Sequence, residues 1–504
     1  MNSPFDKEKY ERLLNGLEIS EILLSNIDKK LFRIEAEYYK KSYLDLEKTV
    51  SKYPMLKEFK PKIICGPFGS NLLDTLYKDC GILVVRPFNL KDFKVADDNL
   101  VFIAEQDIRE NNLKSINKGA VLFSRVGDVK IGMLTDERAT ISPNIISLEM
   151  KSNKLLPEYI VSYFHTKYGM LQIVRELKIS AQPTISTEII GKLRIPNFSH
   201  EFQSEVKKCV NTSHQQNILA KDKYNQAENL LISELGLENF NPSNEKISIK
   251  SLKESFLKTG RLDSEYYQVK YDDYLKKIFA YSEGYELVGE CCNLKDKNYI
   301  PKDDTEYKYI ELANVRSNAE IADCEIMIGK ELPTRARRKV NTGDVIVSSI
   351  EGSLESCALI SEEYNNSLCS TGFYVINSDK LNSESLLTVF KSSLMFNLMK
   401  KGCSGTILTN ITKDEFLKLP VPLLRANIQD EIANYIGQSM EYSKKAKELL
   451  NISTKAVEMA IDKDEETAHN FLDRQTDRQT LIAYYEQQAS YYLRLAVFRL
   501  YEKI

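Results

Sequence analysis

The sequence reads Ser180-Ala181-Gln182-Pro183-Thr184-Ile185-Ser186, followed by Leu193-Arg194-Ile195-Pro196 and Gln203-Ser204-Glu205-Val206. A second stretch has the same plan: Thr406-Ile407-Leu408-Thr409-Asn410-Ile411-Thr412, then Leu419-Pro420-Val421-Pro422, then Gln429-Asp430-Glu431-Ile432. Five pairs match 226 positions apart without a gap: Ile185 and Ile411, Leu193 and Leu419, Pro196 and Pro422, Gln203 and Gln429, and Glu205 and Glu431. Five matches in one register are too many for coincidence, so the sequence contains an internal repeat.

Further segments repeat with nearly the same offset. Arg33-Ile34-Glu35-Ala36-Glu37-Tyr38-Tyr39 recurs as Arg261-Leu262-Asp263-Ser264-Glu265-Tyr266-Tyr267, Gly119-Ala120-Val121-Leu122-Phe123-Ser124 recurs as Gly343-Asp344-Val345-Ile346-Val347-Ser348, and Asn89 pairs with Asn314. The offset changes by only a few residues, as insertions in surface loops would cause. The chain is therefore predicted to be two copies of one module of about 225 residues. A repeat this long is a domain with a connecting helix, not a solenoid unit.

Composition sets the broad class. A chain of 504 residues is long enough for several domains with their own cores. No apolar run approaches membrane-spanning length, and the N-terminus does not read as a signal peptide, so we expect a cytoplasmic protein with no membrane partner. The nine cysteines are scattered without a CxxC pair, which indicates reduced thiols. A net charge of −3 argues weakly against a freestanding nucleic-acid binder.

The first thirty residues show apolar spacings of three and four and are predicted to be helical, and the Arg33–Tyr39 motif is interpreted as a helix with aromatic core contacts. The segment Gly66-Pro67-Phe68-Gly69-Ser70 follows. Two glycines around Pro-Phe predict a tight turn that permits close backbone approach, with Phe68 as its anchor and Ser70 offering a hydroxyl.

At this turn the chain resembles the specificity subunits of type I restriction-modification systems. Their target-recognition domains carry a Gly-Pro-Phe-Gly-Ser turn, a Gly-Asp-apolar-Ser segment, and a Gln-Pro-x-Ile-Ser run leading through a proline-rich strand into a long helix. Here these features are Gly66–Ser70, Ile82-Leu83-Val84-Val85-Arg86-Pro87-Phe88-Asn89, Gly119–Arg125, Gln182–Pro196 and Gln203. The resemblance covers about residues 10–462. The second half departs from it, because it lacks the Gly-Pro-Phe-Gly-Ser turn and has Leu408-Thr409 where the first half has Gln182-Pro183.

The resemblance implies an α/β (α+β) fold: two tandem homologous DNA target-recognition domains, separated by two long antiparallel coiled-coil helices, with pseudo-two-fold symmetry. The expected divisions are residues 1–200 for the first recognition domain, 201–246 for a central spacer helix, 247–424 for the second recognition domain, 425–462 for a C-terminal spacer helix and 463–504 for a helical tail.

Candidate DNA contacts in the first module fall in its turns and strand ends. Short apolar runs at 121–124, 131–134 and 145–148 are predicted strands, and Arg125 and Lys130 flank a loop around Gly127. Two cations beside a flexible glycine suit phosphates or base edges, although a solvated hairpin tip would look the same. The candidates in this module are Gly66, Phe68, Gly69, Ser70, Arg86, Asn89, Ser124, Arg125, Lys130, Gln182 and Thr184.

The second module offers a basic cluster at Arg335, Arg337, Arg338 and Lys339, either a phosphate-binding surface or a solvated charged loop. Ser348-Ser349-Ile350-Glu351-Gly352-Ser353 corresponds to the loop after Ser124, and Glu351 could accept from a cytosine amino group. The candidates here are Asn314, Arg316, Arg335, Arg337, Arg338, Ser348, Ser349, Glu351, Ser353, Thr406 and Asn410.

Two long helices are predicted, from Gln203 to Leu237 and from Gln429 to Ile461, and each would span about 50 Å. A lone helix of this length is unstable in water unless it is paired. An antiparallel coiled coil between the two is the favoured arrangement, and packing of each onto its own domain is the alternative.

The tail from Lys463 has no counterpart in the first half. It contains Asp473-Arg474-Gln475-Thr476 followed by Asp477-Arg478-Gln479-Thr480, which a GACA repeat in the gene would encode. A slippable DNA tract, and hence phase variation, is one hypothesis, and an accidental helical duplication is the other. The aromatic residues after position 480 would pack on the long helices or touch a partner.

Catalytic motifs are missing from the sequence. It has no Lys-Ser/Thr phosphate loop, no Asn/Asp-Pro-Pro-Tyr/Phe motif of an adenine-N6 methyltransferase, and no cluster of histidines and cysteines with metal-ligand spacing. We expect a non-catalytic chain with no metal and no cofactor of its own.

The resemblance implies that double-stranded DNA, two methyltransferase subunits and restriction-motor subunits are partners in phage defence. S-adenosylmethionine, ATP and Mg²⁺ would be bound by those partners. The alternatives are a coiled-coil scaffold that never binds DNA and a fragment of a fused restriction-methylation enzyme.

Overall fold

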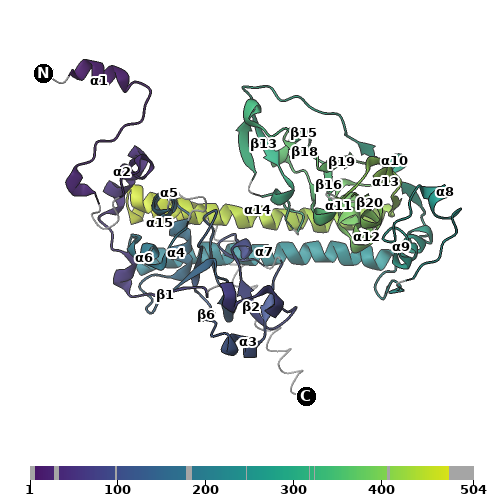
Figure 1. Ribbon diagram of the computed structural model, residues 1–504, viewed down its shortest axis with the longest axis horizontal. Helices are drawn as coiled ribbons and strands as arrows, with labels where there is room; N and C mark the ends of the chain where they lie inside the picture. Colours follow the sequence, from purple (N-terminus) through teal and green to yellow (C-terminus); the bar gives the residue numbers. More distant parts are fainter. Residues whose placement is uncertain are drawn as a thin grey trace. The chain divides into compact units, whose positions relative to one another are not determined.

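The computed structural model describes residues 6–27, 33–67, 69–96, 99–177, 184–245, 247–316, 318–322, 324–405 and 409–475 (Figure 1). The chain divides into two compact units, Met1–Gln215 with Lys445–Ile504, and Gln216–Lys444. The division falls inside two long helices, α7 (His200–Glu234) and α14 (Ala426–Asp462), so each unit contains part of both. The expected divisions at 200, 246 and 424 instead treated the helices as segments separate from the domains.

The first unit contains two sheets. One has the order β1 (Lys62–Cys65), β10 (Ile145–Glu149), β7 (Val121–Ser124), β8 (Ile131–Met133), β4 (Lys94–Val95) and β3 (Leu90–Lys91). The other has the order β5 (Phe102–Ile103), β2 (Ile82–Val85), β9 (Arg138–Ile141) and β6 (Ser115–Asn117), with β2 and β9 parallel. The three strands predicted between residues 121 and 148 are thus confirmed as β7, β8 and β10.

The second unit repeats this plan. One sheet has the order β12 (Asn293–Leu294), β19 (Phe373–Asn377), β16 (Val345–Ser348) and β17 (Cys357–Leu359). The other has the order β14 (Glu325–Ile328), β13 (Glu306–Ile310), β18 (Leu368–Ser370) and β15 (Ala336–Lys339), again with its two middle strands parallel. Two short pairs complete the unit: β11 (Tyr285–Leu287) with β22 (Pro420–Pro422), and β20 (Cys403–Ser404) with β21 (Asn410–Ile411). The duplication seen in the sequence therefore recurs as a shared order of eight strands, to which the first unit adds β4 and β3 at the edge of its larger sheet.

The helices around the sheets repeat as well. In the first unit they are α2 (Lys41–Val50), α4 (Pro157–Phe164), α5 (Lys167–Glu176) and α6 (Thr187–Lys192), and in the second α9 (Val269–Phe279), α11 (Ser383–Lys391), α12 (Ser393–Gly402) and α13 (Lys413–Leu417). Thr166 caps α5 and Ser392 caps α12, each by accepting a backbone N–H with its hydroxyl. The remaining helices are α1 (Lys7–Leu13), α3 (Glu105–Glu110), α8 (Phe256–Thr259), α10 (Val288–Cys291) and α15 (Glu465–Gln475).

Single 3-10 turns join several of these elements. They are η1 (Leu24–Asn26), η2 (Ala36–Tyr39), η3 (Leu56–Phe59), η4 (Gly69–Asn71), η5 (Asp74–Leu76), η6 (Pro87–Asn89), η7 (Leu312–Asn314), η8 (Gly329–Glu331), η9 (Glu351–Ser353) and η10 (Glu362–Tyr364). Two of them, η6 and η7, are repeat equivalents, because Asn89 and Asn314 end them at matching places. The Arg33–Tyr39 motif, interpreted from the sequence as an α-helix, is instead an extended segment that ends in η2.

Each unit has its own main core, and both long helices contribute to it. In the first unit Phe202 and Val206 of α7 lie in one buried cluster with Val457 of α14 and with Tyr159 and Phe164 of α4. In the second unit Ala227 and Leu231 of α7 lie in a buried cluster with Ile432 of α14 and with Phe390 and Met395. Burial of these apolar side chains is the main stabilising term for each unit, since roughly 25 cal/mol is gained per Å² removed from water.

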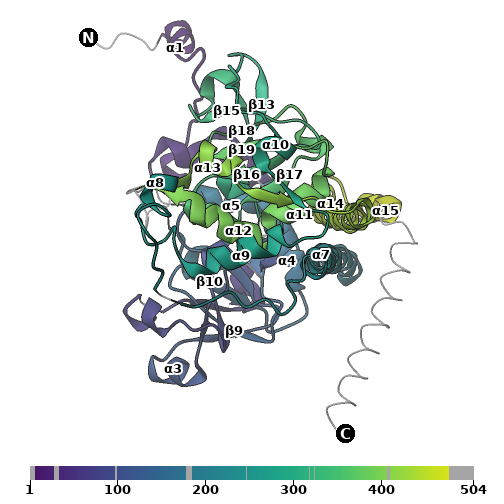
Figure 2. The same cartoon turned by 90° about the vertical axis from the view of Figure 1, so that its right-hand side faces the viewer.

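The two long helices run antiparallel. In the first unit the Ser213 hydroxyl donates to the Ala446 carbonyl at 2.8 Å, and in the second the Ser439 hydroxyl donates to the Ala220 carbonyl at 2.7 Å. Residue numbers rise along α7 as they fall along α14, which fixes the relative direction of the two helices. Figure 2 shows α7 and α14 side by side, viewed along their axes. Ser213 is fully buried, so this bond between the helices is shielded from water. The predicted helices and their antiparallel pairing are confirmed.

The N-terminal prediction is wrong in part. The first thirty residues were expected to be helical, but among those the structure describes only Lys7–Leu13 form an α-helix and Leu24–Asn26 a single 3-10 turn. Gly16 has a φ of +83°, outside the helical region, and Leu13, Leu17 and Leu23 are each more than 60% exposed. An apolar period that finds no core to bury against does not sustain a helix of this length.

The tail is described as far as Gln475, so most of the DRQT repeat and the aromatic segment lie outside the described residues. No helix among the described residues is both long enough and apolar enough to cross a membrane.

Candidate nucleic-acid interface

The loop between β7 and β8 is the centre of the candidate site in the first unit. The Ser124 hydroxyl, at the end of β7, donates to the Asp128 carbonyl at 2.7 Å and accepts from the Lys130 N–H at 2.8 Å. This buried side chain closes the base of the loop, and Gly127 turns its tip with a φ of +71°. Ser124 therefore shapes the loop, which leaves Arg125 exposed and Lys130 half-buried.

The segment before α6 lies beside this loop. The Ile185 N–H donates to the Arg125 carbonyl at 3.0 Å, and Thr184 pairs with Val126 in an isolated bridge. The Arg125 N–H donates to the Asn144 carbonyl at 2.8 Å, and its guanidinium lies 3.6 Å from the Cys65 sulfur. Three separate segments thus hold Arg125 at the end of β1.

The predicted close approach at Gly66 is confirmed. A Cβ placed on Gly66 would lie 1.9 Å from the Ser142 carbonyl oxygen, so only glycine fits there. The Ser142 N–H donates to the Val85 carbonyl, which brings the end of β2 to the same place. Gly66, Arg86, Arg125 and Thr184 therefore lie on neighbouring segments of one edge.

The second unit builds the same arrangement. The Ile411 N–H donates to the Ser349 carbonyl at 2.9 Å, and Asn410 bridges to Ile350. The Ser348 hydroxyl lies 3.1 Å from that of Ser353, so it closes this loop as Ser124 closes the first. The Glu351 N–H donates to the Thr409 carbonyl at 3.0 Å. Ser348, Ser349, Glu351, Ser353 and Asn410 are thus brought together.

The basic cluster of the second unit divides in two. Arg335 is exposed, and its carbonyl accepts from the Thr371 N–H at 2.8 Å, next to Gly372, whose carbonyl accepts from the Ser349 hydroxyl at 2.9 Å. Arg337 stands at a β-bulge of β15, a device that re-aims side chains. Arg335 therefore lies beside the loop of Ser349, whereas the Arg337 guanidinium donates to the Thr334 carbonyl at 3.2 Å. Thr371 and Gly372, which make this connection, were not among the residues selected from the sequence.

Other cations of the candidate set have intramolecular partners. The Arg338 guanidinium donates to the Asp296 carbonyl and, at 3.0 Å, to the Asn298 side chain. The Lys339 ammonium lies 5.3 Å from the centre of the Tyr299 ring, and Arg316 is 3.6 Å from a Glu320 oxygen with only 12% of its side chain exposed. Arg86 donates to the Asn99 carbonyl. These contacts order the side chains and reduce the number of N–H groups that remain available to a ligand.

Asn89 and Asn314 have matching structural roles. The Asn89 side-chain oxygen accepts from the Arg86 N–H at 3.0 Å, and that of Asn314 accepts from the Glu311 N–H at 2.6 Å. Each caps its 3-10 turn, and Asn89 has no exposed surface. This duplicated cap explains why asparagine stands at both places, and Asn89 offers no surface to DNA.

Some candidates cannot be placed. Phe68, Gln182 and Thr406 lie outside the described residues, and so does the side chain of Ser70. Gly69 opens η4 with no neighbour near its Cβ position. For the others, the structure gives position and exposure, and contact with DNA stays a prediction.

Comparison with known proteins finds a family model that matches part of the chain. The model of the family "Type I restriction modification DNA specificity domain" matches residues 285–451, which include the loop of Ser349 and the basic cluster. The resemblance noted from the sequence is thereby confirmed for this part of the chain. No curated protein matches the sequence.

Three solved structures are similar over most of their length. The S subunit of a type I restriction-modification system from M. genitalium is 10% identical with a TM-score of 0.39, and the match covers 81% of this chain and 94% of that one. The HsdS subunit from Thermoanaerobacter tengcongensis is 12% identical with a TM-score of 0.25, covering 80% and 97%. A chain from a study of the assembly of the type I R-M system is 13% identical with a TM-score of 0.26, covering 82% and 99%.

Proposed function

We propose that the chain is the DNA-specificity subunit of a type I restriction-modification complex and that each module reads one half of a bipartite, gapped target. The specificity-domain match over residues 285–451 is the observation that carries this proposal. The first unit enters the proposal because four strands of its larger sheet, β1-β10-β7-β8, and the four strands of its second sheet follow the order found in the matched unit.

The strand-end loops are the proposed reading surfaces. Arg125 and Lys130 in the first module, and Arg335 and Arg337 in the second, would contact phosphates and set the register on the duplex. The polar groups between them, including Ser349, Glu351 and Thr184, would face base edges, where a carboxylate accepts from the amino group of cytosine. The backbone bonds that tie each loop to the segment before α6 or α13 support this role, because they fix the loop before DNA arrives.

The long helices are proposed to set the length of the gap. Helix α7 has 35 residues and α14 has 37, which correspond to about 50–55 Å. A rigid pair of helices would fix the separation of the half-sites, as dimer geometry fixes the spacing of operator half-sites.

Catalysis is assigned to partners. Two methyltransferase subunits would supply S-adenosylmethionine chemistry on a flipped adenine, and a motor-nuclease subunit with ATP and Mg²⁺ would cleave DNA in phage defence. Phosphate contacts made by these subunits would compensate for the small net charge of −3. The complex would act in the cytoplasm.

The decisive experiment is a methylome. The chain is expressed together with the methyltransferase encoded beside it, and N6-methyladenine is mapped by long-read sequencing. A two-part motif with a fixed gap is expected. The proposal would be contradicted if the two proteins were soluble and associated but produced no new methylation. A DNA-binding assay that showed no salt-dependent shift would favour a scaffold that does not bind DNA.

A further inference from the structure

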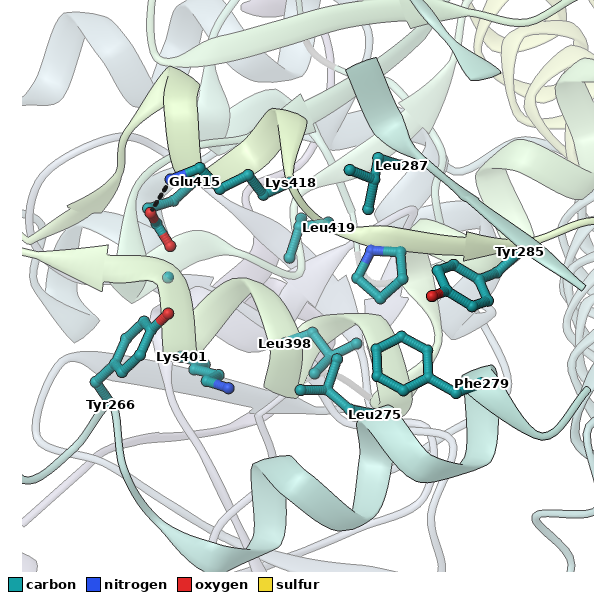
Figure 3. Close-up of a pocket in the computed structure, with 12 residues that line it drawn as sticks. Tyr266, Leu275, Phe279, Tyr285, Leu287, Leu398, Lys401, Glu415, Lys418 and Leu419 are labelled. Carbon is teal, nitrogen blue, oxygen red and sulfur yellow. Dashed lines mark hydrogen bonds and ion pairs between the residues drawn. The ribbon is translucent and has the colours of Figure 1, made fainter. Parts of the chain in front are cut away.

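A pocket of about 260 Å³ opens in the second unit between the Arg261–Tyr267 motif, α9, α12 and α13 (Figure 3). Tyr266, Lys401 and Glu415 lie toward one end of it, and Phe279 and Tyr285 lie at the other. None of these five residues belongs to the candidate DNA surface.

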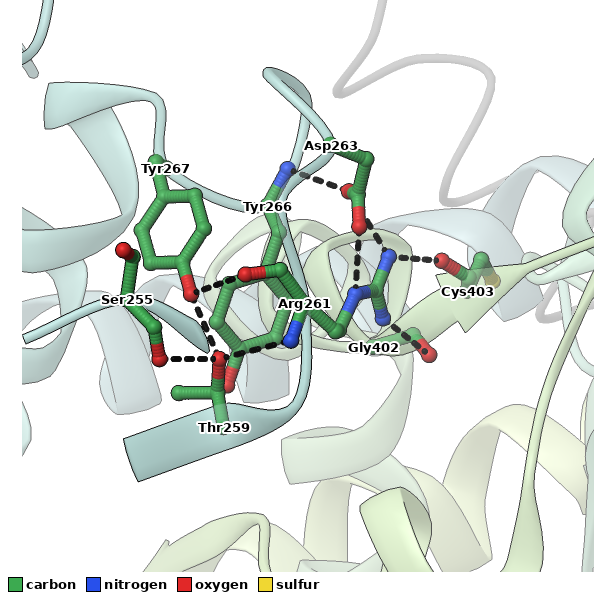
Figure 4. A network of polar contacts seen from close by, with 8 residues as sticks. All are labelled: Ser255, Thr259, Arg261, Asp263, Tyr266, Tyr267, Gly402 and Cys403. Carbon is green, nitrogen blue, oxygen red and sulfur yellow. Dashed lines mark hydrogen bonds and ion pairs between the residues drawn. The ribbon is translucent and has the colours of Figure 1, made fainter. Parts of the chain in front are cut away.

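The repeated motif fixes the polar end of the pocket (Figure 4). The Arg261 guanidinium pairs with Asp263 at 2.7 Å and donates to the carbonyls of Gly402 and Cys403 at 3.3 and 2.8 Å. It also lies over the Tyr266 ring, 4.4 Å from its centre. The Lys401 ammonium lies over the same ring at 4.9 Å, so Tyr266 is held by two cations.

The first unit contains the equivalent pocket, of about 140 Å³, around Tyr38. Arg33 and Arg175 each lie 4.3 Å from the centre of the Tyr38 ring, as Arg261 and Lys401 lie over Tyr266. Carboxylates of the chain itself complete this copy. Glu47 pairs with Arg175 at 2.9 Å, and Glu176 accepts from the Tyr38 hydroxyl at 2.9 Å.

The second unit has lost both carboxylates. Leu275 stands on α9 where Glu47 stands on α2, and Gly402 ends α12 where Glu176 ends α5. Among the described residues, no carboxylate is within ion-pairing distance of Lys401, and the Tyr266 hydroxyl has no hydrogen-bond partner. The nearby Glu415 is instead paired with Lys418 at 3.0 Å. Burial lowers the pKa of Lys401, the effect expected of an ammonium without a counter-ion in contact.

The other end of the pocket is apolar and open to solvent. The rings of Phe279 and Tyr285 lie 4.7 Å apart, and these residues are 51% and 41% exposed. Leu398 lines the pocket where the first unit has Gln172, which there bonds to the backbone of Arg194. The second pocket is thus larger and more apolar than the first, with a cation and a hydroxyl left for a ligand.

We propose that this pocket docks a segment of a partner protein that carries a carboxylate next to a large apolar side chain. The carboxylate takes the place that Glu47 and Glu176 occupy in the first unit, bonding to the Lys401 ammonium and the Tyr266 hydroxyl. The apolar side chain packs against Phe279 and Tyr285. A protein is favoured over a small molecule because these rings are exposed at the rim, where they extend the contact beyond the pocket.

The test restores the missing carboxylate within the chain. Leu275→Glu places an acid where Glu47 pairs with Arg175, so Lys401 acquires a partner of its own. Gly402 is left unchanged, because a Cβ there would lie 2.8 Å from the Ile411 Cδ1 atom. Short random peptides are selected on the wild-type chain and counter-selected on Leu275→Glu. Recovered peptides are expected to carry Asp or Glu beside a large apolar residue and to bind Leu275→Glu at least tenfold more weakly.

Controls separate this site from general electrostatics. Lys401→Gln should weaken the peptides as Leu275→Glu does, whereas Lys400→Gln, the same charge change one residue away on α12, should not. Peptides in which Asn or Gln replaces the Asp or Glu should no longer bind to the wild-type chain. Equal binding to wild type and Leu275→Glu, or no enrichment of acidic peptides, would overturn the proposal. Binding of 3-phenylpropionate as tight as that of the peptides would also overturn it, in favour of a small-molecule site. The selection does not involve DNA or methylation, so it succeeds or fails independently of the proposed function.

Discussion

Gln203 shows how a single retained side chain joins elements of a module. Its amide oxygen accepts from the Leu156 N–H at 2.9 Å, and its nitrogen donates to the carbonyls of Lys154 and Phe198 at 3.0 and 2.9 Å. Gln429 makes the same set of bonds in the second unit, with Asn382, Lys380 and Leu424. The glutamine therefore ties a long helix to the start of α4 or α11.

Replacement of Gln203 by leucine should destabilise the first unit. The side chain is almost fully buried, and its loss leaves the Leu156 N–H and two carbonyls without partners. A cost of about 1–3 kcal/mol in the free energy of unfolding is expected. Urea unfolding would measure it, with Gln438→Leu as the control, since Gln438 bonds only to Asn434 one turn away. Equal midpoints for the two variants would contradict this account.

His165 should make stability depend on pH. Its ring stacks on Phe93 at 4.0 Å and is 3.1 Å from the Ile131 carbonyl oxygen, and burial lowers the pKa of His165 to about 4. An unfolded histidine titrates near pH 6.5, so the unfolded chain binds more protons between about pH 4 and 6.5. Stability is therefore present above pH 6.5 and lost as the pH falls through this window, by roughly 3 kcal/mol.

This prediction is checked by urea midpoints at pH 7 and pH 5. The difference between the two should shrink in His165→Gln and persist in His200→Gln, because His200 is exposed on the first turn of α7. A wild-type midpoint that does not change with pH would refute it. Burial lowers the pKa of His214 to about 4 in the same way, so some pH dependence should remain in the first variant.

At the residue scale the sequence showed which positions matter but not why. The pairing of Asn89 with Asn314 was visible, and both were assigned to DNA, whereas the structure makes them caps of 3-10 turns. The recurrence of a residue in both modules indicates that it is needed, but it does not show which group the residue bonds to. That partner is a backbone N–H three residues away, which no side-chain pattern reveals.

At the scale of elements, the loops at the strand ends differ from ordinary hairpin tips because a distant segment holds each one. Ile185 and Ile411, far along the chain from the loops, bond to Arg125 and Ser349 in the same geometry. The proline-rich run that first revealed the repeat thus begins at the candidate site. Its retained isoleucines are buried and its neighbours Thr184 and Asn410 face the loops.

Charge reversal at Arg125 should weaken DNA binding. Arg125 is exposed, and its loss removes one phosphate contact, so the assembled complex should bind roughly tenfold more weakly and show a shallower salt dependence by about one unit. Arg125→Glu is compared with Lys118→Glu, which lies beyond the opposite end of β7 and pairs with Glu137. Equal affinities measured over a salt titration would place the DNA surface elsewhere.

Element prediction succeeded where burial followed the pattern and failed where it did not. The runs at 121–124, 131–134 and 145–148 are buried strands and were predicted correctly, because their apolar side chains meet a core, whereas β9 in the same stretch was not predicted. The N-terminal leucines follow a helical period just as clearly, but they remain exposed, and only a short helix forms. Periodicity alone does not show whether the protein provides another surface against which the apolar face can pack.

At the scale of the whole chain, each unit is assembled from parts far apart in sequence. The first takes its last helical segments from residues 445–475, and its core includes Ala468 and Leu472. The sequence predicted two modules, and the strand orders agree with it. The position of the division inside the helices was not predictable, because a regular helical pattern does not show where the helix stops packing on one unit and begins to pack on the other.

Matched deletions in the long helices should shorten the gap in the DNA target. Removing residues 216–222 together with 437–443 takes two turns from each helix and removes Ala220 with its bonding partner Ser439. The helices lose about 10 Å, so the methylated motif should lose about three base pairs from its gap. A methylome with an unchanged gap would reject the helices as the determinant of spacing, and a deletion in one helix alone serves as the disrupted control.

Because strands of the two units follow a common order, corresponding residues of the two modules can be compared with each other within one chain. The two modules carry corresponding positions within a single polypeptide. Where they still agree in polar residues, at Gln203 and Gln429 or at Ser213 and Ser439, the agreement is accounted for by bonds within the protein. Where one has Arg125 the other has Ser349, although the backbone there is held identically. Polar residues that the two modules share mark side chains that the fold requires. Positions at which the residues differ on the same backbone mark the places where each module is free to vary.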